Sequence, residues 1–160
     1  MTEPRVLYDR LHTAEYEGKR LRCRWSELNG RWYFSITDIL GIISGSGNPR
    51  NYWKAVKNTL RQGGQWKPEY CTLAGLRAGD GKIYLTDCAD LQQLQRIIRR
   101  AHLKKNAAFM EYLAAFSQTE PEDGMEKIAV RICRDPLFDP AKPSSAGTSW
   151  VLKLGVDIPK

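Results

Sequence analysis

The sequence predicts an α+β fold: a small mixed domain with β-hairpins and a helix-turn-helix-like helix pair. Three observations lead to this prediction. An alternating segment runs into Asn29-Gly30, a dipeptide typical of hairpin turns. Two segments with one apolar side each are separated by Gly45-Ser46-Gly47, as in two helices joined by a tight turn. Further helical patterns follow a short apolar strand pattern at 83–85.

The first expected element is a hairpin over residues 18–36, after a loose start that extends to about Tyr8. Asn29 and Gly30 predict a type I′ turn, because both of its central positions favour a positive φ. The strand before the turn alternates three apolar residues with three arginines, the period of a half-buried strand: Leu21, Cys23 and Trp25 with Arg20, Arg22 and Arg24.

Two helices should follow the hairpin. The segment "SITDILGIIS" predicts a short helix capped by Thr37 or Asp38, whose side chains can accept from free backbone N–H groups. A second helix should begin with Asn48 as its N-cap and Pro49 at its first position, and run to about Gln62.

The later elements follow the same reasoning. A strand at 83–85 should pair through the Asp80-Gly81 turn with the residues before it. Thr86 or Asp87 should cap a third helix, and a fourth is expected over residues 106–118. The third helix has four apolar residues at helical spacing: Leu91, Leu94, Ile97 and Ile98.

The composition of "TEPEDG" (119–124) marks a domain boundary, so we expect a principal domain over 1–117 and a short C-terminal segment of unknown role over 118–160. Residues 125–133 fit a helical stripe better than the strand alternation they also show. A linker rich in Pro and Ser should follow at 135–148, and 149–160 should form a strand or an extended tail.

Composition excludes several classes of protein. The 160 residues hold no apolar run of the roughly 18 that a membrane helix needs, and the N-terminus lacks the apolar core of a signal peptide. A cytoplasmic protein without membrane partners is therefore expected. The four cysteines form no C-x-x-C pair, so we expect reduced, mostly buried thiols, with no metal and no cofactor.

The charge distribution indicates a polyanionic partner. Residues 1–116 hold 19 Lys and Arg against 11 Asp and Glu, and no acid occurs between Asp38 and Glu69. A basic excess confined to one part of a domain is typical of proteins that bind nucleic acid. The basic excess therefore predicts a polyanionic partner, and together with the family resemblance given below it makes double-stranded DNA the expected partner, which would associate the protein with the nucleoid when it is bound.

The helix from Pro49 is the predicted DNA-reading element. At 100° per residue, its cations fall within an arc of about 100°, and Trp53 lies on the opposite, apolar side. Lys and Arg neutralise phosphates, and Arg or Asn can also read base edges. An ordinary solvated helix face would show the same pattern. The seven predicted DNA contacts are Arg50, Asn51, Lys54, Lys57, Asn58, Arg61 and Lys67. The arginines of residues 20–24 are the next candidates.

Three motifs in order carry a family resemblance: "WYFSITDILGIIS", "NPRNYWKAVKNTL" and "LTDCAD". Over about residues 16–100 the chain resembles the BRO-N domain of prophage antirepressor-like proteins. This resemblance implies a small α+β DNA-binding domain that takes part in transcription regulation in phage and prophage proteins. The chain departs from the pattern around "CTLAGLRAGDGK" and in its short C-terminal segment.

Other functions have less support in the sequence than DNA binding. No nucleophile-elbow, P-loop or zinc-protease motif is present, so no enzyme and no catalytic residues are predicted. Asp87 and Asp90 are explained by helix capping rather than by a paired-carboxylate site. A protein-interaction module that binds a repressor or another acidic protein remains the alternative. The sequence leaves open whether the protein forms a homodimer.

Overall fold

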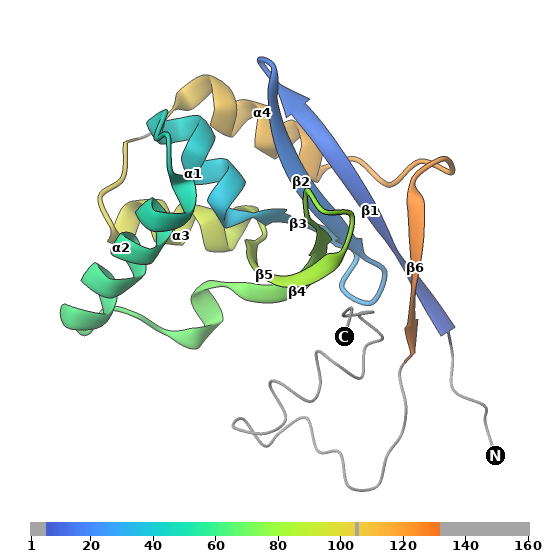
Figure 1. The fold of residues 1–160 in the computed structure, drawn as a ribbon, viewed down its shortest axis with the longest axis horizontal. Coiled ribbons are helices and arrows are strands. Elements are labelled where there is room, and N and C mark those ends of the chain that lie inside the picture. Colours follow the sequence, from blue (N-terminus) through green and yellow to red (C-terminus); the bar gives the residue numbers. More distant parts are fainter. Residues whose placement is uncertain (1–5, 105, 132–160) are drawn as a thin grey trace, which may run out of the picture.

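The computed structural model describes residues 6–104 and 106–131 (Figure 1). Six strands form one antiparallel sheet in the order β4-β5-β3-β2-β1-β6, and the predicted α+β class is confirmed. The strands are β1 (Val6–Tyr16), β2 (Lys19–Ser26), β3 (Arg31–Ser35), β4 (Thr72–Arg77), β5 (Ile83–Ala89) and β6 (Glu126–Arg131). The helices are α1 (Ile36–Ser44), α2 (Pro49–Gln62), the short 3₁₀ helix η1 (Pro68–Tyr70), α3 (Leu91–Arg100) and α4 (Ala107–Ser117).

Two apolar clusters occupy the two faces of the sheet. The four α-helices cover one face, where Trp32 and Phe34 of β3 are almost fully buried (Figure 1). On the other face the sheet curls over a smaller cluster that includes Leu11, Leu76 and Ile128. The curl brings the two edge strands of the sheet, β4 and β6, close together, so that Arg77 of β4 forms an ion pair with Glu126 of β6.

The curl changes the environment of the arginines in β2. Arg20, Arg22 and Arg24 were expected to lie on the solvent side of a half-buried strand. Arg24 is instead buried, and its Nε atom donates to Asp9 Oδ2 at 2.7 Å. Arg22 holds Asp38, with 2.9 Å between Nε and Oδ2. Of these three arginines of β2, only Arg20 is exposed.

The predicted turns and caps are partly wrong. The β2–β3 pair is present, but its turn is a four-residue loop over 27–30 in which Gly30, and not Asn29, has a positive φ. The N-cap of α1 is Ser35 rather than Thr37 or Asp38, and the Ser35 Oγ atom accepts from Asp38 N at 3.2 Å.

The third helix also begins later than predicted. β5 extends to Ala89, so Thr86 and Asp87 still pair with β4 and cannot cap a helix. Asp90 caps α3 instead, and its side chain and that of Gln93 bond reciprocally to each other's backbone N–H. The predicted pairing of this strand through the Asp80-Gly81 turn is confirmed.

Both ends of the described chain contribute strands that the sequence did not predict. Residues from Val6 form β1 rather than a loose start, and the helix expected over 125–133 is wrong, because 126–131 form β6. β6 pairs with β1 and buries Ile128 and Val130. The predicted boundary at 117/118 lies between α4 and β6, and it therefore separates β6 from the other five strands of the same sheet. The linker and tail expected over 135–160 lie outside the described residues.

Candidate nucleic-acid interface

The helix α2 is positioned by its cap and by one close approach to α1. Asn48 caps it, as predicted, with its Oδ1 atom accepting from Asn51 N at 3.2 Å. The turn between the helices is possible because Gly45 adopts a φ of 68°. Gly41 also has no room for a side chain, since a Cβ atom there would lie 2.9 Å from Pro49 Cγ. Glycine at position 41 thus lets the two helices pack directly against each other.

The inner face of α2 is held by packing and by one carboxylate. Trp53, Val56 and Leu60 are buried against α1 and the sheet, as the wheel predicts for Trp53. Asp87 of β5 accepts a hydrogen bond from Trp53 Nε1 at 2.8 Å. The same oxygen, Oδ2, lies 3.0 Å from Lys57 Nζ. Asp87 therefore fixes the rotation of α2 about its own axis.

The outer face of α2 carries most of the predicted contact residues. Five of them are exposed: Arg50, Asn51, Lys54, Asn58 and Arg61. Lys67, in the loop after α2, is exposed as well. Within residues 6–104 and 106–131, none of the four cations in this set has a carboxylate within 4.0 Å. The helix itself contains no acidic residue.

Lys57 does not belong to this exposed outer face of α2. Its side chain is only 23% exposed, it pairs with Asp87, and its Nζ atom lies over the rings of Trp53 and Trp66. The expectation that Lys57 faces solvent is therefore wrong. Lys57 lies only about 40° from Trp53 on the helical wheel, which places it at the border of the apolar side.

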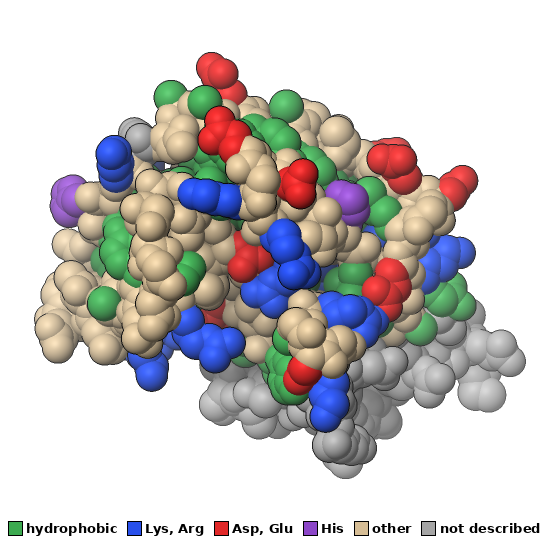
Figure 2. Space-filling model, turned by 45° about the horizontal axis from the view of Figure 1, so that its top comes forward, with side chains coloured by type: hydrophobic (Ala, Val, Ile, Leu, Met, Phe, Trp, Pro, Cys, Tyr) green, Lys and Arg blue, Asp and Glu red, His purple; other side chains and the backbone are tan. Residues whose placement is uncertain are grey.

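Acidic and basic side chains are unevenly distributed on the surface. On the face shown in Figure 2, Asp and Glu are more frequent toward the top of the view, and Lys and Arg gather across its middle and lower part. One basic extension leads from α2 to α3. Arg61 lies over the ring of Trp66, Trp66 packs edge-on to Tyr70, and Arg96 of α3 lies over Tyr70.

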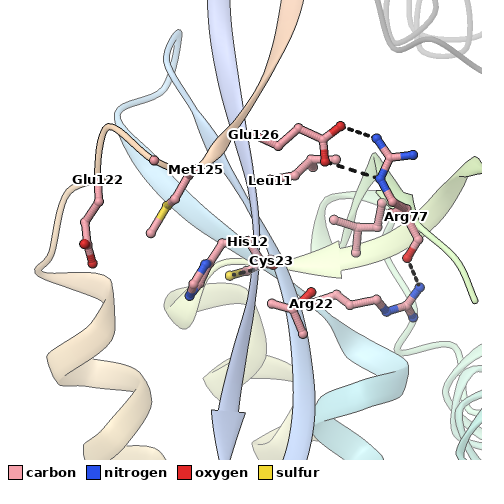
Figure 3. Close-up of a pocket in the computed structure, with 11 residues that line it drawn as sticks. Leu11, His12, Arg22, Cys23, Arg77, Glu122, Met125 and Glu126 are labelled. Atoms are coloured by element: carbon pink, nitrogen blue, oxygen red, sulfur yellow. Dashed lines mark hydrogen bonds and ion pairs between the residues drawn. The ribbon is translucent and has the colours of Figure 1, made fainter. Parts of the chain in front are cut away.

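A separate cavity of about 430 Å³ lies where β1 and β2 meet the connection from α4 to β6 (Figure 3). Glu122, Met125 and His12 lie on one side of it, and Arg22 and Arg77 on the other. Both arginines already have carboxylate partners, Asp38 and Glu126. Within the described residues no group of His, Cys, Asp and Glu side chains could hold a metal ion.

The cysteine thiols that the structure describes are free, and their environments suppress reactivity. Burial raises the pKa of Cys23 and of Cys71 to about 12, and burial also raises the pKa of Cys88. Cys133 lies outside the described residues. Because the thiolate is the nucleophilic form, these three thiols should react slowly near neutral pH.

This expectation can be measured in a Cys133→Ser variant. At pH 8 the folded variant should react with a disulfide reagent far more slowly than the same protein in denaturant. Because the folded pKa of Cys23 and Cys71 lies above the ordinary value, the free energy of unfolding should fall as pH rises from about 9 to about 12. Rapid labelling of all three thiols in the folded state would contradict the described burial.

The comparisons with known proteins identify no relative. No protein-family model matches the chain. No curated protein and no solved structure matches it at a significant level. No helix in the described ranges is long and apolar enough to cross a membrane. The assignment of a function therefore rests on the geometry of α2 and on the sequence motifs.

Proposed function

We propose that this protein binds double-stranded DNA through the outer face of α2, as a transcription regulator of the prophage antirepressor type in the bacterial cytoplasm. The observation that carries the proposal is the exposed face of α2, which presents arginine, lysine and asparagine and no carboxylate. Cations of this kind bind the phosphate backbone, and Asn and Arg can read base edges. The motifs shared with BRO-N domains support the same reading.

The outer face of α2 also has suitable geometry for a groove. In helix-turn-helix proteins, the second of two helices joined by a tight turn places its exposed polar side in the major groove, and α1 and α2 are joined in this order. Trp53 and Asp87 anchor the opposite side, so the exposed residues project from a fixed helix. Asn51 and Asn58 are the proposed base-reading residues, and Arg50, Lys54 and Arg61 the proposed phosphate contacts.

The test is a salt titration of binding to mixed-sequence duplex DNA. The logarithm of the association constant should fall linearly with the logarithm of salt concentration, because phosphate contacts release counterions. The Arg50→Ala/Lys54→Ala/Arg61→Ala variant should lower that slope by about three units, roughly one for each phosphate contact. Removing Lys82, Lys104 and Lys127, exposed cations outside α2, is the matched control and should change the slope much less.

Asn58→Ala separates base reading from charge. It removes no charge, so the salt slope should stay the same, while discrimination at one base pair should fall by about 1–3 kcal/mol. Absence of duplex binding at low salt would contradict the proposal. Tight binding to an acidic protein, with weak dependence on salt, would favour the protein-interaction alternative.

A further inference from the structure

The tip of the β1–β2 hairpin lies beside the turn that joins α1 to α2. A shallow hollow of about 300 Å³ is lined on the hairpin side by Lys19 and Arg20. Gly45, Ser46 and Pro49 line it from the turn between the helices. Two cations that are some 30 residues away from α2 in sequence thus reach the N-terminal end of that helix.

The charges around this hollow make it cationic. Lys19 and Arg20 are exposed, and neither has a carboxylate of the described chain within 4.0 Å. The one acid in the lining, Asp38, is already held by Arg22, whose Nε and Nη2 atoms lie 2.9 and 3.2 Å from its two oxygens. Arg50, which is exposed, follows directly after Pro49. A cationic surface therefore continues from the hairpin tip onto the outer face of α2.

The length of α2 indicates what this extension would meet. Its 14 residues span about 21 Å at 1.5 Å per residue, whereas the major groove of B-DNA is about 12 Å wide. A helix lying across the groove at a steep angle reaches past its edge, so groups that flank its N-terminus meet the sugar–phosphate backbone rather than base edges. Lysine and arginine are suited to that backbone, and the hairpin tip offers no amide side chain for reading bases.

We infer that the tip of the β1–β2 hairpin is a second contact of the DNA interface, in which Lys19 and Arg20 neutralise phosphates that border the groove occupied by α2. This inference rests on the proposed function. The hairpin contributes affinity and fixes the direction of α2 in the groove, while sequence discrimination stays with the helix, because phosphate contacts carry no sequence information. Glu15 and Glu17 belong to the same hairpin but do not line the hollow.

The experiment compares two double variants of the full chain. Lys19→Ala/Arg20→Ala should lower the salt slope of duplex binding by about two units and weaken binding at fixed salt by on the order of tenfold or more. Base-pair discrimination should not change. The control, Lys82→Ala/Lys127→Ala, removes the same charge from the β4–β5 turn and from β6 and should leave the slope close to that of the unaltered protein.

Phosphate ethylation interference gives an independent readout. The hairpin variant should lose interference at phosphates beside the footprint and keep it at the phosphates that depend on Arg50 and Lys54. Lys19→Gln/Arg20→Gln removes the charges but keeps longer, polar side chains than alanine does, so a matching loss in that variant with an unchanged denaturation midpoint excludes a folding defect as the cause.

The outcomes separate the inference from the proposed function. If the hairpin variants match the control while the α2 triple variant loses binding, the hairpin inference is wrong and the DNA-binding proposal stands. If the unaltered protein binds no duplex, both are wrong. If the hairpin variants lose only an interaction with an acidic protein, the surface serves a protein partner and the inference is again overturned.

Discussion

Replacing Trp53 with alanine is expected to lower the free energy of unfolding by about 3–5 kcal/mol, because it opens a large cavity between α2 and the core. Trp53 is 5% exposed and belongs to the main apolar cluster. The substitution also removes the indole hydrogen bond to Asp87. Chemical denaturation of the variant and of the unaltered protein measures the difference.

Trp53→Phe is the matched control for this prediction. It keeps an aromatic ring in the core and removes the indole N–H, while Asp87 retains Lys57 as a partner. A much smaller loss is expected than for alanine, because the hydrogen bond alone contributes about 1 kcal/mol. If Trp53→Ala unfolds at the same denaturant concentration as the unaltered protein, α2 does not pack through this face. The proposed DNA-binding face would then be wrong as well.

Asp9→Ala is the second substitution with a large expected effect. Asp9 and Arg24 form an ion pair under the curl of the sheet, with side chains only 10% and 4% exposed. Asp9 Oδ1 also accepts from Glu27 N at 3.0 Å, and Arg24 Nη1 donates to Gly75 O at 3.2 Å. Removing the carboxylate leaves a buried guanidinium without its counter-charge, which should cost about 3–5 kcal/mol of stability.

Two controls test the cause of that loss. Asp9→Leu/Arg24→Met removes both charges and should recover most of the stability, because no unpaired charge stays buried. Arg77→Ala breaks an ion pair whose side chains are 42% and 46% exposed, and it should change stability by only about 0–1 kcal/mol. Equal effects of Asp9→Ala and Arg77→Ala would contradict the described burial of Arg24.

The helices could be predicted from the sequence because their signals are local. Asn48 and Pro49 mark the start of α2, and residues at helical spacing give the buried stripes of α3 and α4. The residues that cap each helix were harder to predict. Ser35 caps α1 because the helix already begins at Ile36, which places Thr37 and Asp38 inside its first turn. Asp38 instead pairs with Arg22 of β2, a contact that only the fold creates.

β1 and β6 could not be predicted because their signals depend on distant partners. In β1, Leu7 and Leu11 are buried, and Leu11 packs into the cluster on the curled side. Ala14 packs into the cluster under the helices, so the buried positions change from odd to even along the strand and a simple alternation is lost. In β6 the apolar residues fit either a helix or a strand. Pairing with β1 decides the outcome, and the local sequence carries no sign of it.

The division of α2 into a buried face and an exposed face was predicted in its main part. The wheel separated Trp53 from Arg50 and Lys54 correctly, since burial of one helix face follows from local periodicity. It misplaced Lys57, because the partner Asp87 comes from β5 and only the fold brings the two together. The position of Lys19 and Arg20 beside α2 likewise depends on the tertiary arrangement of the hairpin.

The pairing of β1 with β6 has a consequence for the order of events during synthesis. The register joins Leu11 to Glu126, so β1 is made long before its partner on that side exists. At a synthesis rate of about 5–20 residues per second, β6 leaves the ribosome about 5–25 s after β1. Until then the nascent chain keeps an unpaired strand edge, which is open to association with other chains. Folding of this protein should therefore depend on chaperone protection during translation more than folding of a helical domain of the same size.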